Sequence, residues 1–345
     1  MNIMKKIRVM VVDDSAVFRM LLVRGISTDP DIEVVAQAID PFDASEKIVQ
    51  FHPDVMTCDV QMPKMDGIEF IRKLIPQYPI PVVVVSSISN SVIDALKAGA
   101  VDFVSKPDIS SVSLVKDFLD ELINKVKIAS KAKVFKESKS QQKNLTNLNK
   151  QSFERKIIAI GASTGGTEAI FRILQDFPSQ MPGIVITQHI PPVFSKMFAE
   201  RLNKSTNLNV KEAKTGDILL PGMAILAPGD QHMKIVSANE GYGIECNYGE
   251  KVNGHRPSVD ILFESVAKEA GKKAIGVILT GMGYDGAKGL LAMRRKGART
   301  IGQDESSCVV YGMPKVAFDL GAVEKQASLD QVPVEIYRLL SECHP

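Results

Sequence analysis

The segment 157–170 constrains the fold most strongly, because it specifies a strand, a tight turn and a helix in immediate succession. The apolar, β-branched run 157–160 leads into a glycine-rich turn at 161–166, and a helical pattern follows directly. This succession is typical of a parallel α/β sheet. Ser163 lies at the apex of the turn, where the backbone N–H groups of the helix N-terminus converge. Such a turn supports an activated serine beside an oxyanion hole, provided that a base and an orienting acid come from elsewhere in the chain.

The length of the chain indicates two or three domains. Its 345 residues exceed a typical single domain, and 45% of them are hydrophobic, which suffices for ordinary cores. The formal net charge of +2 gives no electrostatic argument for a nucleic-acid partner. The four cysteines show neither metal-ligand spacing nor a disulfide framework. The sequence contains no signal-peptide pattern and no apolar run of about 18 residues, so we expect a cytoplasmic protein that is not embedded in a membrane.

Five strand–helix units occupy residues 1–127 and predict a doubly wound parallel sheet of the flavodoxin-like kind. The predicted strands span residues 7–12, 32–38, 54–58, 81–85 and 101–104, and a helical pattern follows each of them. Ser15 is expected to cap the first helix. In sheets of this type the functional groups gather at the carboxyl ends of the strands.

Polar side chains follow four of these strands. Asp13 and Asp14 follow the first strand, Asp59 the third, Ser86 the fourth and Lys106 the fifth. Three carboxylates at one edge repel one another, and a hard cation such as Mg²⁺ accepts their oxygen atoms as ligands. One carboxylate can then attack a phosphoryl group whose oxygens a lysine neutralises. Asp and Ser are also common helix caps, so each residue alone is weak evidence, whereas the full set indicates a phosphoryl-transfer site.

This domain resembles the receiver domain of two-component response regulators. The motifs that carry the resemblance are VVDDS at residues 11–15, DVQMPKMDG at 59–67 and SKP at 105–107. The resemblance implies that Asp59 is the phospho-acceptor, and that Asp13 and Asp14 help Asp59 to hold Mg²⁺. It also implies that Lys106 contacts the phosphoryl group and that a histidine kinase is the phosphodonor.

Two further positions of the receiver pattern are less certain. Ser86 occupies the position of the switch hydroxyl in the resemblance, and its neighbour Ser87 stays an alternative. Phe103 stands where many receivers carry a switch aromatic, although a phenylalanine of the core is the simpler interpretation.

Residues 128–154 predict a flexible, basic linker. Lysines are interleaved with Ser, Gln and Asn, and apolar periodicity is nearly absent. Aromatic residues are not interleaved with the lysines, so the stretch does not favour a nucleic-acid surface.

A second α/β pattern spans residues 155–345 and predicts a Rossmann-like domain with a parallel sheet. The predicted strands include 156–160, 183–187 and 274–279, and a helix is expected over 258–271. The stretch 210–248 is rich in glycine and short apolar runs, which predicts hairpins or an antiparallel excursion.

Three strand ends of this second domain offer Ser163, His189 and Asp285. A neutral imidazole can accept the serine proton, and a carboxylate on the other ring nitrogen fixes its tautomer and stabilises the imidazolium. His255 precedes a helix and is the second candidate for the base, whereas His232 is expected in a surface turn. The sequence therefore predicts a Ser-His-Asp triad.

Two other families fit the serine turn less well. Residues 161–165 match G-x-S-x-G, but α/β-hydrolases order their triads Ser, Asp/Glu, His, and here the order is Ser163, His189, Asp285. A dinucleotide-binding turn requires G-x-G-x-x-G and an acidic residue at the end of the next strand, where this chain has Gln188 and His189.

The second domain resembles the catalytic domain of the chemotaxis protein-glutamate methylesterases over about residues 155–320. The motifs are GASTGGTEAI at residues 161–170, TQHIPP at 187–192, APGD at 227–230, HRPSVD at 255–260, LTGMGYDG at 279–286 and QDESSCVVYGMP at 303–314. The resemblance implies a phosphorylation-activated esterase for methylated glutamates of methyl-accepting chemoreceptors, with a chemotaxis histidine kinase as phosphodonor. It also implies deamidation of receptor glutamines and no cofactor in the esterase site. The backbone N–H groups of Thr164 and Met282 are the expected oxyanion donors.

Two other functions remain open from the sequence. A DNA-binding response regulator requires a basic recognition helix, and none stands out in residues 155–345. A signalling adaptor without catalysis would have lost part of the triad, whereas all three residues are present.

Overall fold

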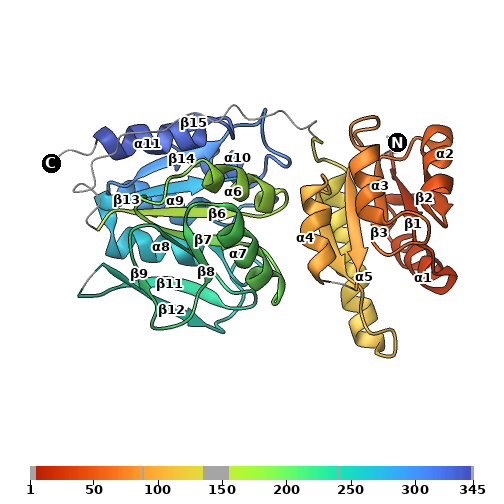
Figure 1. Cartoon of the computed structure of the whole chain (residues 1–345), viewed down its shortest axis with the longest axis horizontal. Helices are drawn as coiled ribbons and strands as arrows, with labels where there is room; N and C mark the ends of the chain where they lie inside the picture. The colour runs from red at the N-terminus through yellow and green to blue at the C-terminus, as the bar shows by residue number, and fades with distance from the viewer. Residues whose placement is uncertain (1–4, 88, 135–154, 240, 343–345) are drawn as a thin grey trace. The chain divides into compact units, whose positions relative to one another are not determined.

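The computed structural model describes residues 5–87, 89–134, 155–239 and 241–342, with the side chains of residues 89 and 90 left out. Two compact units divide the chain, residues 1–138 and residues 139–345, and Figure 1 shows both. Of the predicted linker 128–154, residues 135–154 lie outside the described residues.

The first unit contains a five-stranded parallel sheet in the order β2-β1-β3-β4-β5. Each strand is followed by a helix, as the alternation of sequence patterns predicts (Figure 1). The elements are β1 (Ile7–Val12), α1 (Ala16–Ile26), β2 (Ile32–Ala38), α2 (Pro41–Phe51), β3 (Val55–Asp59), α3 (Gly67–Leu74), β4 (Val82–Ser86), α4 (Ser89–Lys97), β5 (Asp102–Ser105) and α5 (Val112–Ala129). The predicted doubly wound sheet is confirmed.

Local chemistry explains where these elements begin. The hydroxyl of Ser15 accepts a hydrogen bond from Phe18 N–H, which confirms the predicted cap of α1. All five residues of β4 are buried, as expected for a strand covered on both faces. β4 starts one residue later than predicted, and it therefore ends on Ser86, which pairs with Ser105 of β5.

The second unit contains a seven-stranded parallel sheet in the order β15-β14-β13-β6-β7-β10-β8 and a three-stranded antiparallel sheet in the order β11-β12-β9. The strands are β6 (Ile157–Ala162), β7 (Gly183–Gln188), β8 (Asn209–Glu212), β9 (Ile218–Leu219), β10 (Met223–Leu226), β11 (His232–Ser237), β12 (Tyr242–Asn247), β13 (Ala274–Ile278), β14 (Arg299–Gln303) and β15 (Lys325–Ala327). The helices are α6 (Gly166–Gln175), α7 (Phe194–Ser205), α8 (Val259–Glu269), the short 3-10 helix η2 (Gly271–Lys273), α9 (Ala287–Arg295), α10 (Met313–Asp319) and α11 (Val332–Glu342).

The stretch 210–248 is only partly antiparallel. β9, β11 and β12 form the predicted antiparallel excursion, but β10 pairs in parallel with both β7 and β8. The prediction missed β10, although three consecutive apolar residues of this strand, Ala224 to Leu226, are fully buried. Such a continuous buried run is typical of a strand inside a parallel sheet rather than of a half-exposed hairpin.

Helix α8 lies between the two sheets of this unit, because it contacts β6, β7 and β13 on one side and β11 on the other. Its approach to β6 requires glycine at residue 161, where a Cβ atom would lie 2.2 Å from Cγ1 of Val259. The apolar cluster around α8 includes the fully buried Phe263 and Leu262. The packing of α8 on the centre of the parallel sheet places the N-terminus of this helix beside the ends of β6 and β13.

Within the described ranges, none of the helices combines the length and apolarity that a membrane crossing requires.

Candidate functional site

The three predicted triad residues come from the ends of neighbouring strands. Ser163 follows β6 and His189 follows β7, while Asp285 lies in the loop between β13 and α9. Backbone hydrogen bonds fix the three loops to one another: Ser163 N–H donates to Thr280 O at 3.0 Å, and His189 N–H donates to Ala162 O at 3.1 Å. The order β13-β6-β7 therefore brings the serine, histidine and aspartate to one edge of the sheet.

The turn that carries Ser163 is held from two sides. Gly165 has a positive φ of 76°, which closes the turn, and Gly166 N–H donates to Ser163 O at 2.7 Å. The side-chain amide of Gln188 donates to Ser163 O at 2.9 Å and to His189 O at 3.1 Å. Gln188 thus joins the serine loop to the histidine loop.

His189 is oriented by Asp285. Nε2 of His189 lies 2.8 Å from Oδ2 of Asp285, and the imidazole side chain is only 9% exposed. Because the carboxylate is an acceptor, Nε2 carries the proton in the neutral ring and Nδ1 keeps its lone pair. Nδ1 is buried and has no hydrogen-bond partner among the described residues, so it is the nitrogen available as a base.

Asp285 is bound by the N-terminus of α8. Burial by itself raises the pKa of Asp285, but the contact with His189, followed by the hydrogen bonds from Asn253 and Val259, outweighs this effect and holds the pKa well below its usual range. The N-terminus of α8 also favours the anionic carboxylate, because its free N–H groups and its dipole are positive at this end. The donors to Asp285, besides His189, are Val259 N–H at 2.6 Å, Asp260 N–H at 3.3 Å, Ser258 Oγ at 2.7 Å and Asn253 Nδ2 at 2.8 Å.

A tight hairpin at residues 252–255 contacts both Asp285 and His189. Val252 and His255 exchange two backbone hydrogen bonds, and the central residues Asn253 and Gly254 have positive φ values of 54° and 83°. Two positive φ values in a two-residue hairpin are typical of a type I′ turn, which favours Asn-Gly. The side-chain amide of Asn253 reaches Asp285, and the ring of His255 stacks on the ring of His189.

His255 therefore lies in the site, as its role of second candidate for the base requires. Its ring, however, stacks on the ring of His189. The two ring centroids lie 3.7 Å apart, with an interplanar angle of 12°. Burial, followed by the neighbouring His189, lowers the pKa of His255 to about 4, so its imidazole is neutral near pH 7.

The expectation that His232 lies in a surface turn is wrong. His232 begins β11 and is 2% exposed. Its Nδ1 accepts a hydrogen bond from Ser258 N–H at 3.1 Å, and its Nε2 donates to Glu250 O at 2.8 Å. His232 thus holds the start of α8 in place beneath Asp285. A turn assignment based on its polar neighbours could not anticipate the pairing of β11 with β12.

The predicted oxyanion donors lie next to Ser163. Thr164 follows the serine directly, and Met282 follows Gly281, where a Cβ atom would come within 2.7 Å of the Ser163 Cβ. Met282 is 37% exposed, and its N–H group makes no hydrogen bond within the described residues. The role of both N–H groups stays a prediction.

The receiver residues also converge. Nζ of Lys106 lies 2.8 Å from Oδ2 of Asp13 and 2.6 Å from Oδ2 of Asp59. Ligand oxygens of Asp13, Asp14 and Asp59 lie within 4.8 Å of one another, and this all-oxygen set suits a hard cation. Burial, with a contribution from Asp59, raises the pKa of Asp13. Burial opposes the charge of Lys106, but its hydrogen bonds to the two carboxylates outweigh burial and raise its pKa.

The two candidate switch serines differ in exposure. Ser86 is 1% exposed at the end of β4, whereas Ser87 is exposed. Phe103 is buried, which agrees with its interpretation as a residue of the core. Nζ of Lys125 lies 4.9 Å from the centroid of its ring. Which serine acts as the switch hydroxyl stays a prediction.

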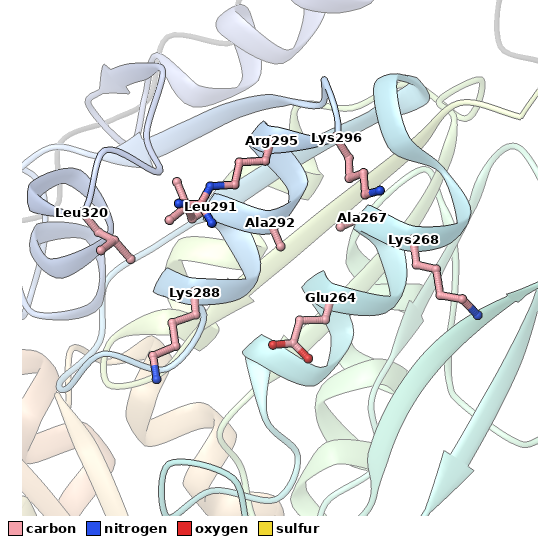
Figure 2. Close-up of a pocket in the computed structure, with 9 residues that line it drawn as sticks. All are labelled: Glu264, Ala267, Lys268, Lys288, Leu291, Ala292, Arg295, Lys296 and Leu320. Carbon is pink, nitrogen blue, oxygen red and sulfur yellow. The ribbon is translucent and has the colours of Figure 1, made fainter.

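A groove on the second unit lies outside both sites. It runs between α8 and α9, and Figure 2 shows the apolar side chains of Ala267, Leu291 and Ala292 together with those of four basic residues and Glu264. None of the predicted site residues lines it. The lining residues are Glu264, Ala267, Lys268, Lys288, Leu291, Ala292, Arg295, Lys296 and Leu320.

Comparison with known families accounts for both units. Residues 158–336 match the family model of the CheB methylesterase, and residues 9–118 match the response regulator receiver domain. The chain belongs to the CheB methylesterase family. It is 53% identical over 339 residues to the "Protein-glutamate methylesterase/protein-glutamine glutaminase 2" of Syntrophomonas wolfei. The matched region covers 98% of this chain and 99% of the relative.

A second relative matches almost the whole chain in sequence, and a solved catalytic domain shares the fold over about half of the chain. The protein-glutamate methylesterase/protein-glutamine glutaminase of Salmonella typhi is 46% identical over 342 residues, covering 98% of each chain. The crystal structure of the Thermotoga maritima CheB methylesterase catalytic domain is 37% identical, with a TM-score of 0.52, and covers 53% of this chain and 98% of that one.

Proposed function

We propose that the protein is a phosphorylation-activated serine esterase that hydrolyses glutamate methyl esters of chemoreceptors, releases methanol and thereby serves chemotactic adaptation. It also deamidates specific receptor glutamines, a proposal supported by the words protein-glutamine glutaminase in the names of its relatives. One observation carries the proposal for this chain: His189 is held by Asp285 through Nε2, while its buried Nδ1 has no partner within the described residues beside the serine turn.

In the first half of the reaction, Ser163 Oγ attacks the ester carbonyl carbon and its proton passes to Nδ1 of His189. The negative charge on the carbonyl oxygen is stabilised by the backbone N–H groups of Thr164 and Met282. When the tetrahedral intermediate collapses, the bond to the methoxy oxygen breaks. His189 returns its proton to this oxygen, so that methanol leaves and a glutamyl ester of Ser163 remains.

In the second half, His189 takes a proton from water as the water oxygen attacks the glutamyl ester. The Ser163–acyl bond then breaks, Ser163 regains its proton from His189, and the free glutamate carboxylate is released. With a glutamine substrate the same steps release ammonia instead of methanol. Asp285 stays ionised throughout and stabilises the imidazolium of His189.

The receiver supplies the activating signal. A chemotaxis histidine kinase provides the phosphoryl group, which Asp59 accepts, and Lys106 pairs with the phosphoryl oxygens. Asp13, Asp14 and Asp59 would hold Mg²⁺, because their oxygens converge on one place. When bound, Mg²⁺ neutralises negative charge on the phosphoryl group. Ser86, the buried one of the two serines, is the proposed switch hydroxyl. We expect the esterase to act in the cytoplasm.

The test is methanol release from methylated receptor membranes, with and without a small phosphodonor and Mg²⁺, with Ser163→Ala as the control. Release that rises with the phosphodonor and disappears in the variant supports the proposal. Methanol release at the same rate with and without the phosphodonor would contradict activation by the receiver. No release under any condition would contradict the esterase.

A further inference from the structure

The face of the catalytic imidazole is covered by a second imidazole. The rings of His189 and His255 are nearly parallel, and their centroids lie 3.7 Å apart. The edge of His189 is fixed by Asp285 through Nε2, so the two contacts constrain different motions of the ring. The triad described above uses only the edge contact.

Stacking matters because a histidine ring rotates easily about its Cβ–Cγ bond. This terminal torsion has broad energy wells, and one hydrogen bond through Nε2 leaves tilting of the ring weakly opposed. A flat ring at 3.7 Å opposes it strongly, since any rotation about Cβ–Cγ drives one edge of His189 into His255. The direction in which Nδ1 points is therefore set by His255 as well as by Asp285.

His255 is itself held rigidly. It is the last residue of the hairpin 252–255, and its backbone N–H and C=O both pair with Val252 at 2.9 and 3.0 Å. The next residue, Arg256, donates to Asp230 Oδ1 at 2.6 and 2.9 Å and to Gly249 O at 2.8 Å. A ring mounted on this braced turn can serve as a fixed surface for His189.

The charge state of His255 suits this position. Burial has the largest effect in keeping the ring neutral, and among the described residues His189, Asp285 and Lys251 are the charged or titratable groups that act on its pKa. A neutral aromatic face tolerates the imidazolium that His189 becomes when it takes the serine proton, whereas a charged ring would repel it.

We propose that His255 is a positioning residue of the esterase, which holds the ring of His189 by flat stacking so that Nδ1 keeps a fixed orientation while it accepts the proton of Ser163. This inference rests on the proposed function, because it assumes that Ser163 and His189 react together. It assigns to His255 a role that requires a flat ring and no proton transfer.

The experiment compares His255→Phe, His255→Leu and His255→Ala with the wild-type chain. Two readouts are used: kcat and KM for methanol release from methylated receptor membranes, and the rate at which a fluorophosphonate modifies Ser163. The second readout needs no receptor. Thermal unfolding followed by circular dichroism shows which variants fold.

We expect kcat and the modification rate to fall about 10-fold in His255→Ala and His255→Leu, since small misplacements of a reacting group are costly. KM should stay within about twofold, because the loss is confined to the chemical step. Phenylalanine supplies a flat ring that cannot titrate, so His255→Phe should keep most of the wild-type rate. If the alanine variant does not fold, the comparison of leucine with phenylalanine decides.

Equal modification rates in all four chains would overturn the inference, and so would a phenylalanine variant as slow as the leucine variant. The failure of the proposed function looks different. A wild-type chain that releases no methanol but is modified faster than the leucine variant would contradict the substrate and support the role of His255. A wild-type chain that is not modified at Ser163 would overturn both.

Discussion

Replacing Asn253 by glycine tests how far Asp285, the proposed orienting carboxylate, depends on a donor outside the triad. Asn253 Nδ2 donates to Asp285 Oδ1 and to Asp260 Oδ2, each at 2.8 Å. A hydrogen bond to a charged group contributes about 1.5–3 kcal/mol, and about 1.4 kcal/mol corresponds to a tenfold change in rate. We therefore expect kcat for methanol release to fall about 10- to 100-fold, with little change in KM.

Glycine is the appropriate replacement because residue 253 has a φ of 54°. Glycine adopts this conformation without strain, so the variant removes the amide and leaves the turn intact. Asn253→Asp is the matched second variant, since aspartate also tolerates this backbone but replaces the donor by an acceptor.

The aspartate variant should be slower than the glycine variant at pH 7 and should partly recover as the pH is lowered. Burial already raises the pKa of Asp260, and a third carboxylate beside Asp260 and Asp285 favours uptake of a proton, which restores a donor. A glycine variant with kcat within about twofold of the wild type would refute the reasoning, because Asp285 would then be held fully by α8 and Ser258.

Four other perturbations follow from the same geometry. Ser163→Ala should abolish methanol release while the chain still takes up phosphate from a small phosphodonor, and an active variant would rule out Ser163 as nucleophile. Asp59→Asn should abolish the stimulation of methanol release by that phosphodonor, and persistent stimulation would place the acceptor elsewhere. Gly281→Ala should reduce kcat at least 10-fold, because the new Cβ would lie 2.7 Å from the Ser163 Cβ, and normal kcat would show that the turn relaxes freely. The native fold keeps His255 neutral, with a pKa of about 4 against 6.5 in the unfolded chain, so its contribution to stability is present above pH 6.5 and is lost as the pH falls toward 4. The loss should be at most about 3.4 kcal/mol relative to His255→Phe, measured by urea unfolding followed by circular dichroism. Equal pH dependence of the two chains would contradict it.

The residues at strand ends could be predicted from the sequence because the rule that governs them is topological. In a parallel sheet the carboxyl ends of the strands meet at one edge, so Ser163, His189 and Asp285 needed only correct strand assignments to be brought together. The same rule placed Asp13 and Asp59 beside Lys106.

The support of the triad was not predicted, because it depends on how a loop packs against a helix far along the chain. Asn253-Gly254 is a strong hairpin signal that can be read locally, but the contacts of Asn253 and His255 depend on where the hairpin lies relative to Asp285. His232 was misplaced for a similar reason, since its polar neighbours indicate a turn and only the pairing of β11 buries it. Periodicity also missed β10, which is too short to be separated from a hairpin strand by pattern alone.

The N-terminus of α8 has one further consequence. Ser258, the N-cap residue, does not cap its own helix, and its hydroxyl is bound to Asp285 instead. The N–H groups of the first turn are therefore satisfied by a carboxylate from a distant loop. The first turn of α8 and the loop of Asp285 should consequently open together, as one cooperative unit in hydrogen exchange. A chain in which this turn has frayed has also released Asp285, the proposed orienting carboxylate, so local opening of this helix end should by itself abolish esterase activity.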